Sequence, residues 1–369
     1  MQYLRACKKG ELKGKTVILR VDFNIEQKTD TFRIDASIPS IRFLMNAGAR
    51  VLIMSHRGRP TPSSIKHGEF SLHITLPYLK KKLGTAPIFF SELHPEHIRT
   101  TISESPLGSV FILENLRFHP GEEENSSAFA KELASLGDIY VNDAFAASHR
   151  KHASVYALPK LLPSYAGIQL EREIETLDMI MKHPKKPLVL ILGGAKAKDK
   201  IGVIRYFLYD AAAILLGGGV ANTLLAARKF PIGDSVYDPT SLPFAKKMLR
   251  EKKVILPIDF VRAENKLLDI GPLSTDLFVA ALKGAKTIVW NGPLGLFERK
   301  KFARGSEEIA KALANHKGFT VAGGGETVSC IRSLKLENKF GFLSTGGGAM
   351  LEYMSGKELP GIAVLTKKK

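Results

Sequence analysis

Polar and cationic residues follow four short apolar runs in the first half of the chain, within residues 20–24, 55–60, 114–119 and 142–152. Ligands of open α/β sheets bind at the carboxyl ends of strands, so residues in these positions are the first candidates for chemistry. The guanidinium group of arginine matches phosphate and carboxylate oxygens with paired hydrogen bonds. One arginine alone would indicate only a surface ion pair, but four strand ends together predict a site for a small, multiply charged anion. Asp22 and Asn24 indicate that hydroxyl groups of the ligand are also recognised.

Glycine turns follow the apolar runs of the second half, within residues 192–196, 216–219, 291–295, 322–327 and 344–348. Glycine lets the backbone approach a ligand, and the amides of a glycine turn that opens a helix bind phosphate with the help of the helix dipole. One such turn is usually a tight connection, whereas five at the ends of one sheet are not explained by packing alone. The second half is therefore predicted to bind a nucleotide.

Two lysines and one glutamate beside these turns are candidates for charge stabilisation. Lys196 and Lys200 are four residues apart, so a helix that starts near Ala195 would place both on one face, close to the phosphates. The alternative is a solvated lysine face. Glu326, after three glycines, is a candidate Mg²⁺ ligand, because Mg²⁺ prefers carboxylate and phosphate oxygens; the alternative is a carboxylate that caps a helix.

The common nucleotide motifs are absent from the sequence. Residues 10–16 resemble a P-loop but are one residue short and precede an apolar run instead of following one. No Gly-x-Gly-x-x-Gly opens a helix after a strand, which weakens the hypothesis of a nicotinamide or flavin enzyme. A dehydrogenase therefore remains an alternative on fold grounds alone.

These residues require a parallel sheet to position them. Short apolar runs recur at intervals too long for hairpins, with helical patterns between them, which is typical of βαβ units. The runs are residues 16–21, 50–54, 110–113 and 139–141, then 188–192, 213–216, 254–256, 287–290, 319–321 and 340–342. We predict an α/β fold of two doubly wound, Rossmann-like parallel sheets joined by a hinge helix.

The expected domains are residues 1–168 for the anion, an interdomain helix over residues 169–183, residues 184–350 for the nucleotide, and a C-terminal segment over residues 351–369. The helix has an apolar stripe at Leu170, Ile174, Leu177 and Ile180. A length of 369 residues agrees with about two domains. The basic tail over residues 366–369 is expected to be a solvated end.

Composition restricts the partners and the compartment. A net charge of +18 favours a polyanionic partner, either nucleic acid or a phosphorylated metabolite. Cys7 and Cys330 form neither a disulfide framework nor a zinc pattern, which suits a reducing compartment. The longest apolar stretch, residues 211–221, is too short to cross a bilayer. A soluble, cytoplasmic protein is expected.

Six strings make the chain resemble the phosphoglycerate kinase family over essentially its whole length. They lie at residues 20–24, 114–119, 192–201, 269–272, 290–298 and 344–349, and together they are highly specific. The resemblance implies that the first domain binds 3-phosphoglycerate or 1,3-bisphosphoglycerate through Asp22, Asn24, Arg33, His56, Arg59, Arg117 and Arg150, with His149 in the same basic patch.

The resemblance also implies sites for ATP or ADP and for Mg²⁺ in the second domain. The implied nucleotide contacts are Lys196 and Lys200, the adenine-pocket residues Gly194, Gly218 and Gly219, and then Asn291, Pro293 and Glu298. Gly325, Glu326 and Thr327 would lie at the magnesium nucleotide phosphates, with Glu326 as the metal ligand, and Gly347 in the turn near the transferring group. Glu326 stands where the family has aspartate, which is one methylene shorter.

The implied mechanism is direct attack of the ADP β-phosphate on the acyl phosphate, with Arg33, Lys196 and the amides near Gly347 as the catalytic groups. Closure about the helix at residues 169–182 would bring the two ligands together, the C-terminal segment would pack on the first domain, and the protein would be a monomer. The alternative is an altered or inactive member of the family whose basic surface binds nucleic acid or another anion; otherwise a nucleic-acid partner is not expected.

Overall fold

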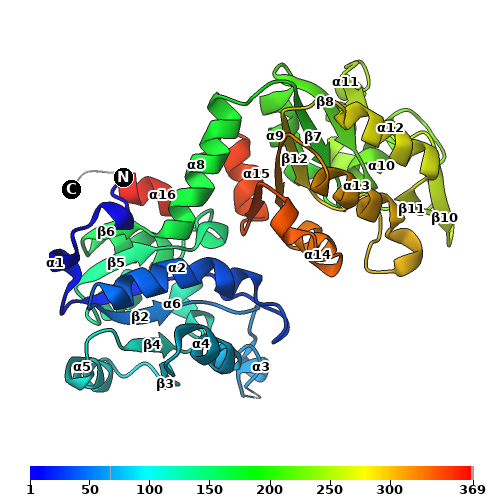
Figure 1. Cartoon of the computed structure of the whole chain (residues 1–369). Coiled ribbons are helices and arrows are strands. Elements are labelled where there is room, and N and C mark those ends of the chain that lie inside the picture. The colour runs from blue at the N-terminus through cyan, green and yellow to red at the C-terminus, as the bar shows by residue number, and fades with distance from the viewer. Residues whose placement is uncertain (67, 367–369) are drawn as a thin grey trace. The chain divides into compact units, whose positions relative to one another are not determined.

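The computed structural model of the protein describes residues 1–66 and 68–366 (Figure 1). The chain divides into two compact units, one made of Met1–Glu175 with Glu358–Lys369 and the other of Thr176–Lys357. Each unit is built on a parallel sheet of six strands, which confirms the predicted pair of doubly wound α/β sheets. The expected tail at residues 367–369 lies outside the described residues.

The sheet of the first unit has the strand order β3-β4-β2-β1-β5-β6, and every pairing in it is parallel. Its strands are β1 (Thr16–Arg20), β2 (Arg50–Met54), β3 (Ile88–Phe90), β4 (Val110–Leu113), β5 (Ile139–Asn142) and β6 (Ser164–Ala166). The central strands are apolar except at their ends, because helices cover both faces of a doubly wound sheet. Helix α2 (Phe32–Asn46) runs in front of these strands in Figure 1.

Shorter helices complete the first unit between the strands. They are α1 (Lys9–Leu12), α3 (Pro62–Lys66), α4 (Leu76–Leu83), α5 (Pro95–Glu104), α6 (Pro120–Glu123) and α7 (Ser127–Ala134), and then α16 (Pro360–Thr366). Gly361 of α16 donates its amide to the carbonyl of Ser148 at 2.8 Å, and the Asn142 side chain donates to the Gly361 carbonyl at 3.1 Å. The end of the chain is thereby attached to β5 and the loop that follows it.

The sheet of the second unit has the strand order β14-β13-β12-β7-β8-β9, again parallel throughout. Its strands are β7 (Leu188–Leu192), β8 (Ala211–Leu216), β9 (Val254–Ile255), β12 (Thr287–Asn291), β13 (Phe319–Gly323) and β14 (Phe342–Ser344). Its helices are α9 (Lys198–Phe207), α10 (Gly218–Ala227), α11 (Leu242–Met248), α12 (Pro272–Leu282), α13 (Arg304–Ala314), α14 (Gly325–Ser333) and α15 (Gly348–Met354).

Three strand features, one strand position and one helix boundary differ from the prediction. The strand expected at residues 340–342 is observed two residues later, as β14. The edge strands β3 and β6 are only three residues long and were not predicted, although β3 has the apolar sequence Ile-Phe-Phe. An antiparallel hairpin, β10 (Phe260–Ala263) and β11 (Lys266–Ile270), was also not predicted. The helix expected near Ala195 begins at Lys198 instead. The prediction that Lys196 and Lys200 share one helix face is therefore wrong, because Lys196 lies in the loop before α9.

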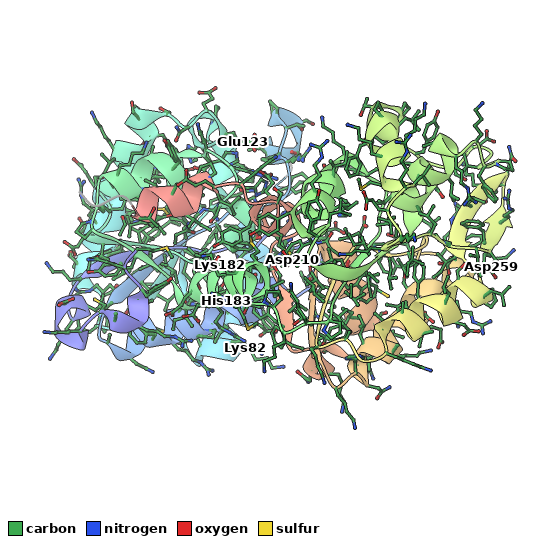
Figure 2. All side chains as sticks on the ribbon, turned by 90° about the horizontal axis from the view of Figure 1, so that it is seen from above. Lys82, Glu123, Lys182, His183, Asp210 and Asp259 are labelled. Atoms are coloured by element: carbon green, nitrogen blue, oxygen red, sulfur yellow. The ribbon has the colours of Figure 1, made fainter. Side chains whose placement is uncertain are left out.

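The predicted helix at residues 169–182 is observed as α8 (Ile168–Lys182). At its end the Lys182 ammonium donates to the Asp178 carboxylate at 2.7 Å, and the exposed His183 follows (Figure 2). No described helix is long and apolar enough to span a bilayer.

In each sheet the order of strands reverses at one point. The reversal lies between β1 and β5 in the first unit and between β7 and β12 in the second. A crevice forms at the carboxyl ends of the strands at such a point, and ligands of doubly wound folds bind there. The residues that follow β1, β5, β7 and β12 are therefore the ones to describe in detail.

Candidate active site

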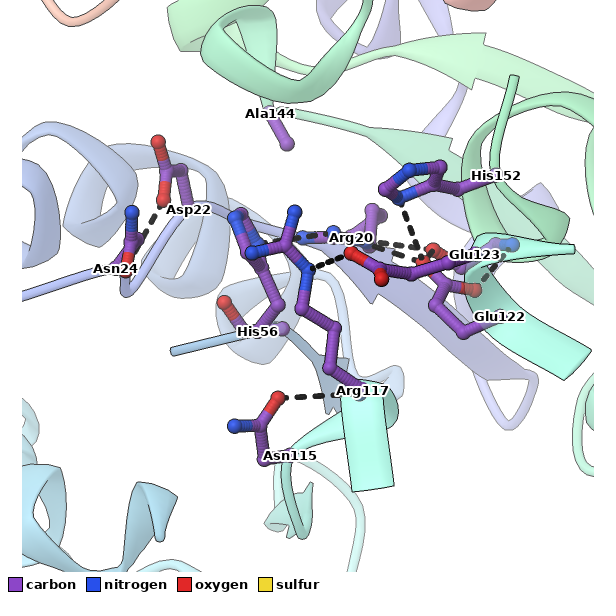
Figure 3. Close-up of polar contacts among 12 residues, drawn as sticks. Arg20, Asp22, Asn24, His56, Asn115, Arg117, Glu122, Glu123, Ala144 and His152 are labelled. Carbon is purple, nitrogen blue, oxygen red and sulfur yellow. Dashed lines mark hydrogen bonds and ion pairs between the residues drawn. The ribbon is translucent and has the colours of Figure 1, made fainter. Parts of the chain in front are cut away.

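Three arginines and one histidine lie at or after four strand ends at the carboxyl edge of the first sheet. Figure 3 shows Arg20, His56 and Arg117 of this group. Arg20 ends β1, His56 follows β2, Arg117 lies in the 3-10 helix η3 (Leu116–Phe118) after β4, and Arg150 follows the 3-10 helix η4 (Phe145–Ala147) after β5. Arg20, Arg117, Arg150 and Arg33 each lower the pKa of the buried His56, in addition to the larger effect of desolvation. The four arginine charges therefore lie near His56.

The loop after β1 is held by its own polar groups. The Asn24 amide donates to the Asp22 carboxylate at 2.9 Å, and the Arg33 guanidinium donates to the Asn24 carbonyl at 2.8 Å. Arg33 also pairs with Asp22 at 3.5 Å. The Asn24 side-chain oxygen accepts a hydrogen bond from the Gly58 amide at 2.8 Å, which joins this loop to the one after β2. Asp22, Asn24 and Arg33 thus form one rigid group beside the cations.

Arg117 lies at the centre of an excess of positive charge. Its Nε pairs with Glu123 at 3.0 Å and its Nη1 donates to the Gly58 carbonyl, but its buried Nη2 has no hydrogen-bond partner among the described residues. Burial first, and then the neighbouring Arg150, lower the pKa of Arg117 to about 10. A buried donor without a partner costs free energy, so this geometry favours an anion that would accept from Nη2.

The remaining predicted residues of the first unit lie around this group. Burial and then the charge of Arg59 lower the pKa of Arg150, although Arg59 itself is exposed. Arg150 donates from Nε to the His149 ring at 3.3 Å. The structure therefore brings together all eight residues that the sequence suggested for the anion.

A buried network behind the cations was not predicted. Glu122 of α6 is fully buried; its carboxylate accepts hydrogen bonds from the amide of Ser154 at 2.9 Å and from its hydroxyl at 2.6 Å. His152 lies 3.9 Å from the same carboxylate, and desolvation with the nearby arginines lowers the pKa of His152 to about 4. Arg20 appeared in the sequence pattern without a role, and nothing in the acidic run around Glu122 indicates burial.

In the second unit, two glycine turns interlock at the point where the strand order reverses. The Gly194 amide donates to the Pro293 carbonyl at 2.7 Å, and the Gly218 amide to the Leu294 carbonyl at 3.1 Å. A side chain on Gly193 would overlap the Pro293 carbonyl oxygen, and Gly292 has a φ of +92°. Only glycine permits this close approach of the loops after β7 and β12.

The N-termini of α10, α14 and α15 open directly after β8, β13 and β14, and none of the three is capped by a described side chain. Their free amides and helix dipoles suit phosphate oxygens. A Cβ on Gly347 would lie 3.6 Å from the Cα of Gly324, so the last two turns are adjacent. A Cβ on Gly325 would meet no atom within 4 Å, which leaves space above this helix end.

Lys200 is buried below these turns, and its ammonium donates to the Asn291 side-chain oxygen at 2.6 Å. Desolvation lowers the pKa of Lys200 to about 8, against the effect of Asp199 and Glu326. Lys196 is exposed and lies near enough to lower the pKa of Glu326. The Thr327 hydroxyl accepts a hydrogen bond from the Gly292 amide at 2.7 Å, which joins α14 to the turn after β12.

A pocket of about 170 Å³ lies beside the turns and brings together several predicted residues, namely Gly194, Gly218, Gly219, Pro293, Glu298 and Glu326. Its other wall is largely apolar and includes Val236, Phe260 and Leu296, which the sequence did not suggest. Phe260 belongs to the unpredicted hairpin. An apolar slot next to free amides suits a flat base attached to phosphates.

The carboxylates of this pocket form a suitable donor set for a hard cation, although a partial one. Desolvation raises the pKa of Glu326 and the nearby Glu298 raises it further, so the two carboxylates are close. No group of three or more His, Cys, Asp or Glu side chains in the described residues could hold a metal ion. Mg²⁺ commonly uses one or two carboxylates together with substrate phosphates and water, and these residues fit that pattern.

Comparison with known proteins shows the family of the chain. The family model described as phosphoglycerate kinase matches residues 7–357. The phosphoglycerate kinase of Moorella thermoacetica is 41% identical over 386 residues, covering 97% of this chain and 98% of the relative. That of Coprothermobacter proteolyticus is 40% identical, covering 98% of each chain.

Two solved structures have the same fold as the whole chain. The crystal structure of phosphoglycerate kinase from Pyrococcus horikoshii has a TM-score of 0.88 at 30% identity and covers 99% of this chain and 98% of its own. The phosphoglycerate kinase structure from Coxiella burnetii has a TM-score of 0.82 at 32% identity, with the same coverage.

Proposed function

The chain belongs to the phosphoglycerate kinase family, and we propose that it transfers a phosphoryl group reversibly between 1,3-bisphosphoglycerate and ADP, giving 3-phosphoglycerate and ATP. The observation that carries the proposal is the cluster of arginines in the first unit, in which Nη2 of buried Arg117 has no hydrogen-bond partner among the described residues and can donate to an anion. The nucleotide half is supported by the uncapped helix ends and the apolar pocket of the second unit.

For the phosphoglycerate ligand we assign roles by charge and position. The guanidinium groups of Arg59, Arg117 and Arg150, with His149, would bind phosphate or carboxylate oxygens. Asp22 and Asn24 would hold the hydroxyl group, and His56 would donate to a ligand oxygen. Arg33 is already held against Asp22, from which it can reach the group being transferred.

For the nucleotide, the apolar pocket would take the base between Gly218 and Gly219 on one side and Pro293 on the other. Glu298 would accept from the ribose, Asn291 would hold Lys200 in place, and Gly325 and Thr327 would border the phosphates. Glu326 would hold Mg²⁺, which when bound neutralises charge on the nucleotide phosphates.

The reaction needs no general base, because the attacking oxygen of the ADP β-phosphate is already ionised. The protein must position the two ligands in line and stabilise the charge that spreads over the equatorial oxygens. We assign this stabilisation to Arg33, Lys196 and the amides near Gly347. Because the two ligands belong to different units, we propose domain closure about α8 as the step that aligns them.

The proposal also includes the domain boundaries predicted from the sequence, a monomeric state and a cytoplasmic location. Both cysteines are free and buried, which supports a reducing compartment. The polyanionic partners suggested by the charge would then be phosphorylated metabolites.

The test is a coupled assay of the purified protein with 3-phosphoglycerate, ATP and Mg²⁺, compared with Lys196→Ala and Glu326→Asp. The exposed Lys198→Ala is the matched control. We expect turnover that Lys196→Ala abolishes and Lys198→Ala retains. Activity that appears only in Glu326→Asp would show an altered metal site. If neither the wild type nor Glu326→Asp turns over, the kinase assignment is refuted and the alternative anion-binding role is favoured.

A further inference from the structure

One buried arginine of the first unit is not among the residues assigned to the substrate. Arg20 ends β1 and is 1% exposed, and its Nη2 lies 3.1 Å from Nδ1 of the buried His56. We infer that Arg20 is a positioning residue that holds His56 as the neutral tautomer with its proton on Nε2, so that the ring is a hydrogen-bond donor to the anionic substrate. This inference rests on the proposed function only for the identity of that substrate.

The tautomer follows from the donors and acceptors present. A guanidinium group has five N–H donors and no acceptor. The contact between Arg20 and His56 is therefore a hydrogen bond only if Nδ1 offers its lone pair. A neutral imidazole with a lone pair on Nδ1 carries its proton on Nε2. Protonation of His56 would instead place two N–H groups against each other.

Arg20 cannot turn away from His56 because its other donors are engaged. Its Nε donates to the Ser154 hydroxyl at 2.8 Å, and that hydroxyl donates to the Glu122 carboxylate at 2.6 Å. The carboxylate also lies 3.9 Å from Nη2 of Arg20, which balances the buried charge (Figure 3). The guanidinium group is thus fixed by η5 (Ala153–Ala157) and α6 while it donates to His56.

The electrostatic surroundings agree with a neutral ring. Desolvation is the main cause that lowers the pKa of His56 well below 6.5, and the charges of Arg20, Arg117, Arg150 and Arg33 lower it further. These cations come from β1, η3, the loop after η4 and α2. Nε2 of the neutral His56 could therefore donate to an anion bound among these cations without taking up a proton from solvent.

The test is ¹⁵N-histidine NMR of the full chain, with His56 assigned by its loss in His56→Gln. We expect wild-type His56 to show a protonated Nε2 and an unprotonated Nδ1 between about pH 5.5 and 8.5. Arg20→Gln introduces an amide that can accept as well as donate, so both tautomers should appear. We expect its KM for 3-phosphoglycerate to rise at least about tenfold, with an unchanged KM for ATP.

Two further variants separate positioning from a structural role. Arg20→Lys keeps a group with donors only, so it should restore the Nε2-protonated ring. The matched control is Arg50→Gln, because Arg50 begins β2 at the opposite edge of the sheet and donates to the Ser105 and Ser103 carbonyls. It should leave both the tautomer and the KM unchanged.

A wild-type His56 that carries its proton on Nδ1, or on both nitrogens at pH 7, would overturn the inference. If Arg20→Gln fails to fold because Glu122 loses its partner, Arg20→Met combined with Glu122→Gln removes both charges. A folded double variant whose His56 still shows only the Nε2-protonated form would also overturn it. The spectrum does not depend on turnover, so an inactive protein would refute the proposed function without deciding the tautomer.

Discussion

Replacement of Lys200 by methionine should stabilise the second unit at neutral pH while it weakens nucleotide binding. Lys200 is 8% exposed, and desolvation lowers its pKa from 10.5 to about 8. Below pH 8 the folded protein must therefore hold a buried ammonium that the unfolded chain would hold in water. The gap between the two pKa values corresponds to about 3 kcal/mol of lost stability at pH 7. This loss disappears as the pH rises from 8 to 10.5, because only the unfolded chain still binds the proton there.

The substitution also removes the hydrogen bond from Lys200 to Asn291, which is worth about 1 kcal/mol. We therefore expect Lys200→Met to raise the free energy of unfolding by about 2 kcal/mol at pH 7 and by almost nothing at pH 9.5. Urea unfolding followed by tryptophan fluorescence measures the free energy of unfolding of the second unit. Trp290 is the single tryptophan of the chain and is buried in β12 of that unit. Lys198→Met, at an exposed position, should change neither value.

A stability difference between wild type and Lys200→Met that stays constant from pH 7 to 9.5 would refute this reasoning. It would mean that Lys200 keeps an ordinary pKa and therefore has no desolvation cost in the folded protein. The expected pH dependence, together with weaker ATP binding by calorimetry, would show that a costly buried charge is retained for the nucleotide.

Three further results are expected. Arg117→Lys keeps the charge but loses the paired donors, so the KM for 3-phosphoglycerate should rise about tenfold or more with ATP affinity unchanged; an unchanged KM would contradict the role of Arg117. Burial raises the pKa of Asp143 from 3.8 to about 6, so the stability of the wild type falls as the pH rises through this range. Asp143→Asn should therefore be about 2 kcal/mol more stable than the wild type at pH 7 and equally stable near pH 4. Urea unfolding followed by circular dichroism measures both values. Gly193→Ala should cost about 1–3 kcal/mol in the same unfolding measurement, because its Cβ would overlap the Pro293 carbonyl, whereas Gly325→Ala has open space and should cost little.

The parts of the fold that sequence predicts well are those in which burial determines residue type. The runs at residues 50–54, 110–113 and 188–192 coincide with β2, β4 and β7, because strands covered on both faces are mostly apolar. The edge strands β3 and β6 are partly exposed and only three residues long, so neither contains an apolar run long enough to indicate a strand. The β10–β11 hairpin turns at Glu264 and Asn265, both with positive φ, and a glutamate there is a weak turn signal.

The wrong start of α9 has a physical cause in the interlocked turns. The Gly194 amide donates to the Pro293 carbonyl, and the Gly194 carbonyl accepts from the Gly219 amide at 2.9 Å. The backbone before Ala195 is thereby hydrogen-bonded to neighbouring loops, and the helix begins only at Lys198. Those partners lie 25 and about 100 residues away, so local helix propensity cannot reveal them.

The candidate site likewise contains residues that the sequence predicts and residues that it does not. Residues that face a ligand follow strand ends, and their position in the chain is enough to suggest them. The groups that hold them come from elsewhere, and sequence does not distinguish them from solvated neighbours. Glu122 and Glu123 are adjacent in one acidic run, yet Glu122 is fully buried against Ser154 and Arg20 while Glu123 is half exposed and pairs with Arg117. Because the two carboxylates point from successive positions of the short helix α6, its orientation on the sheet decides which one supports Arg20 and which one supports Arg117.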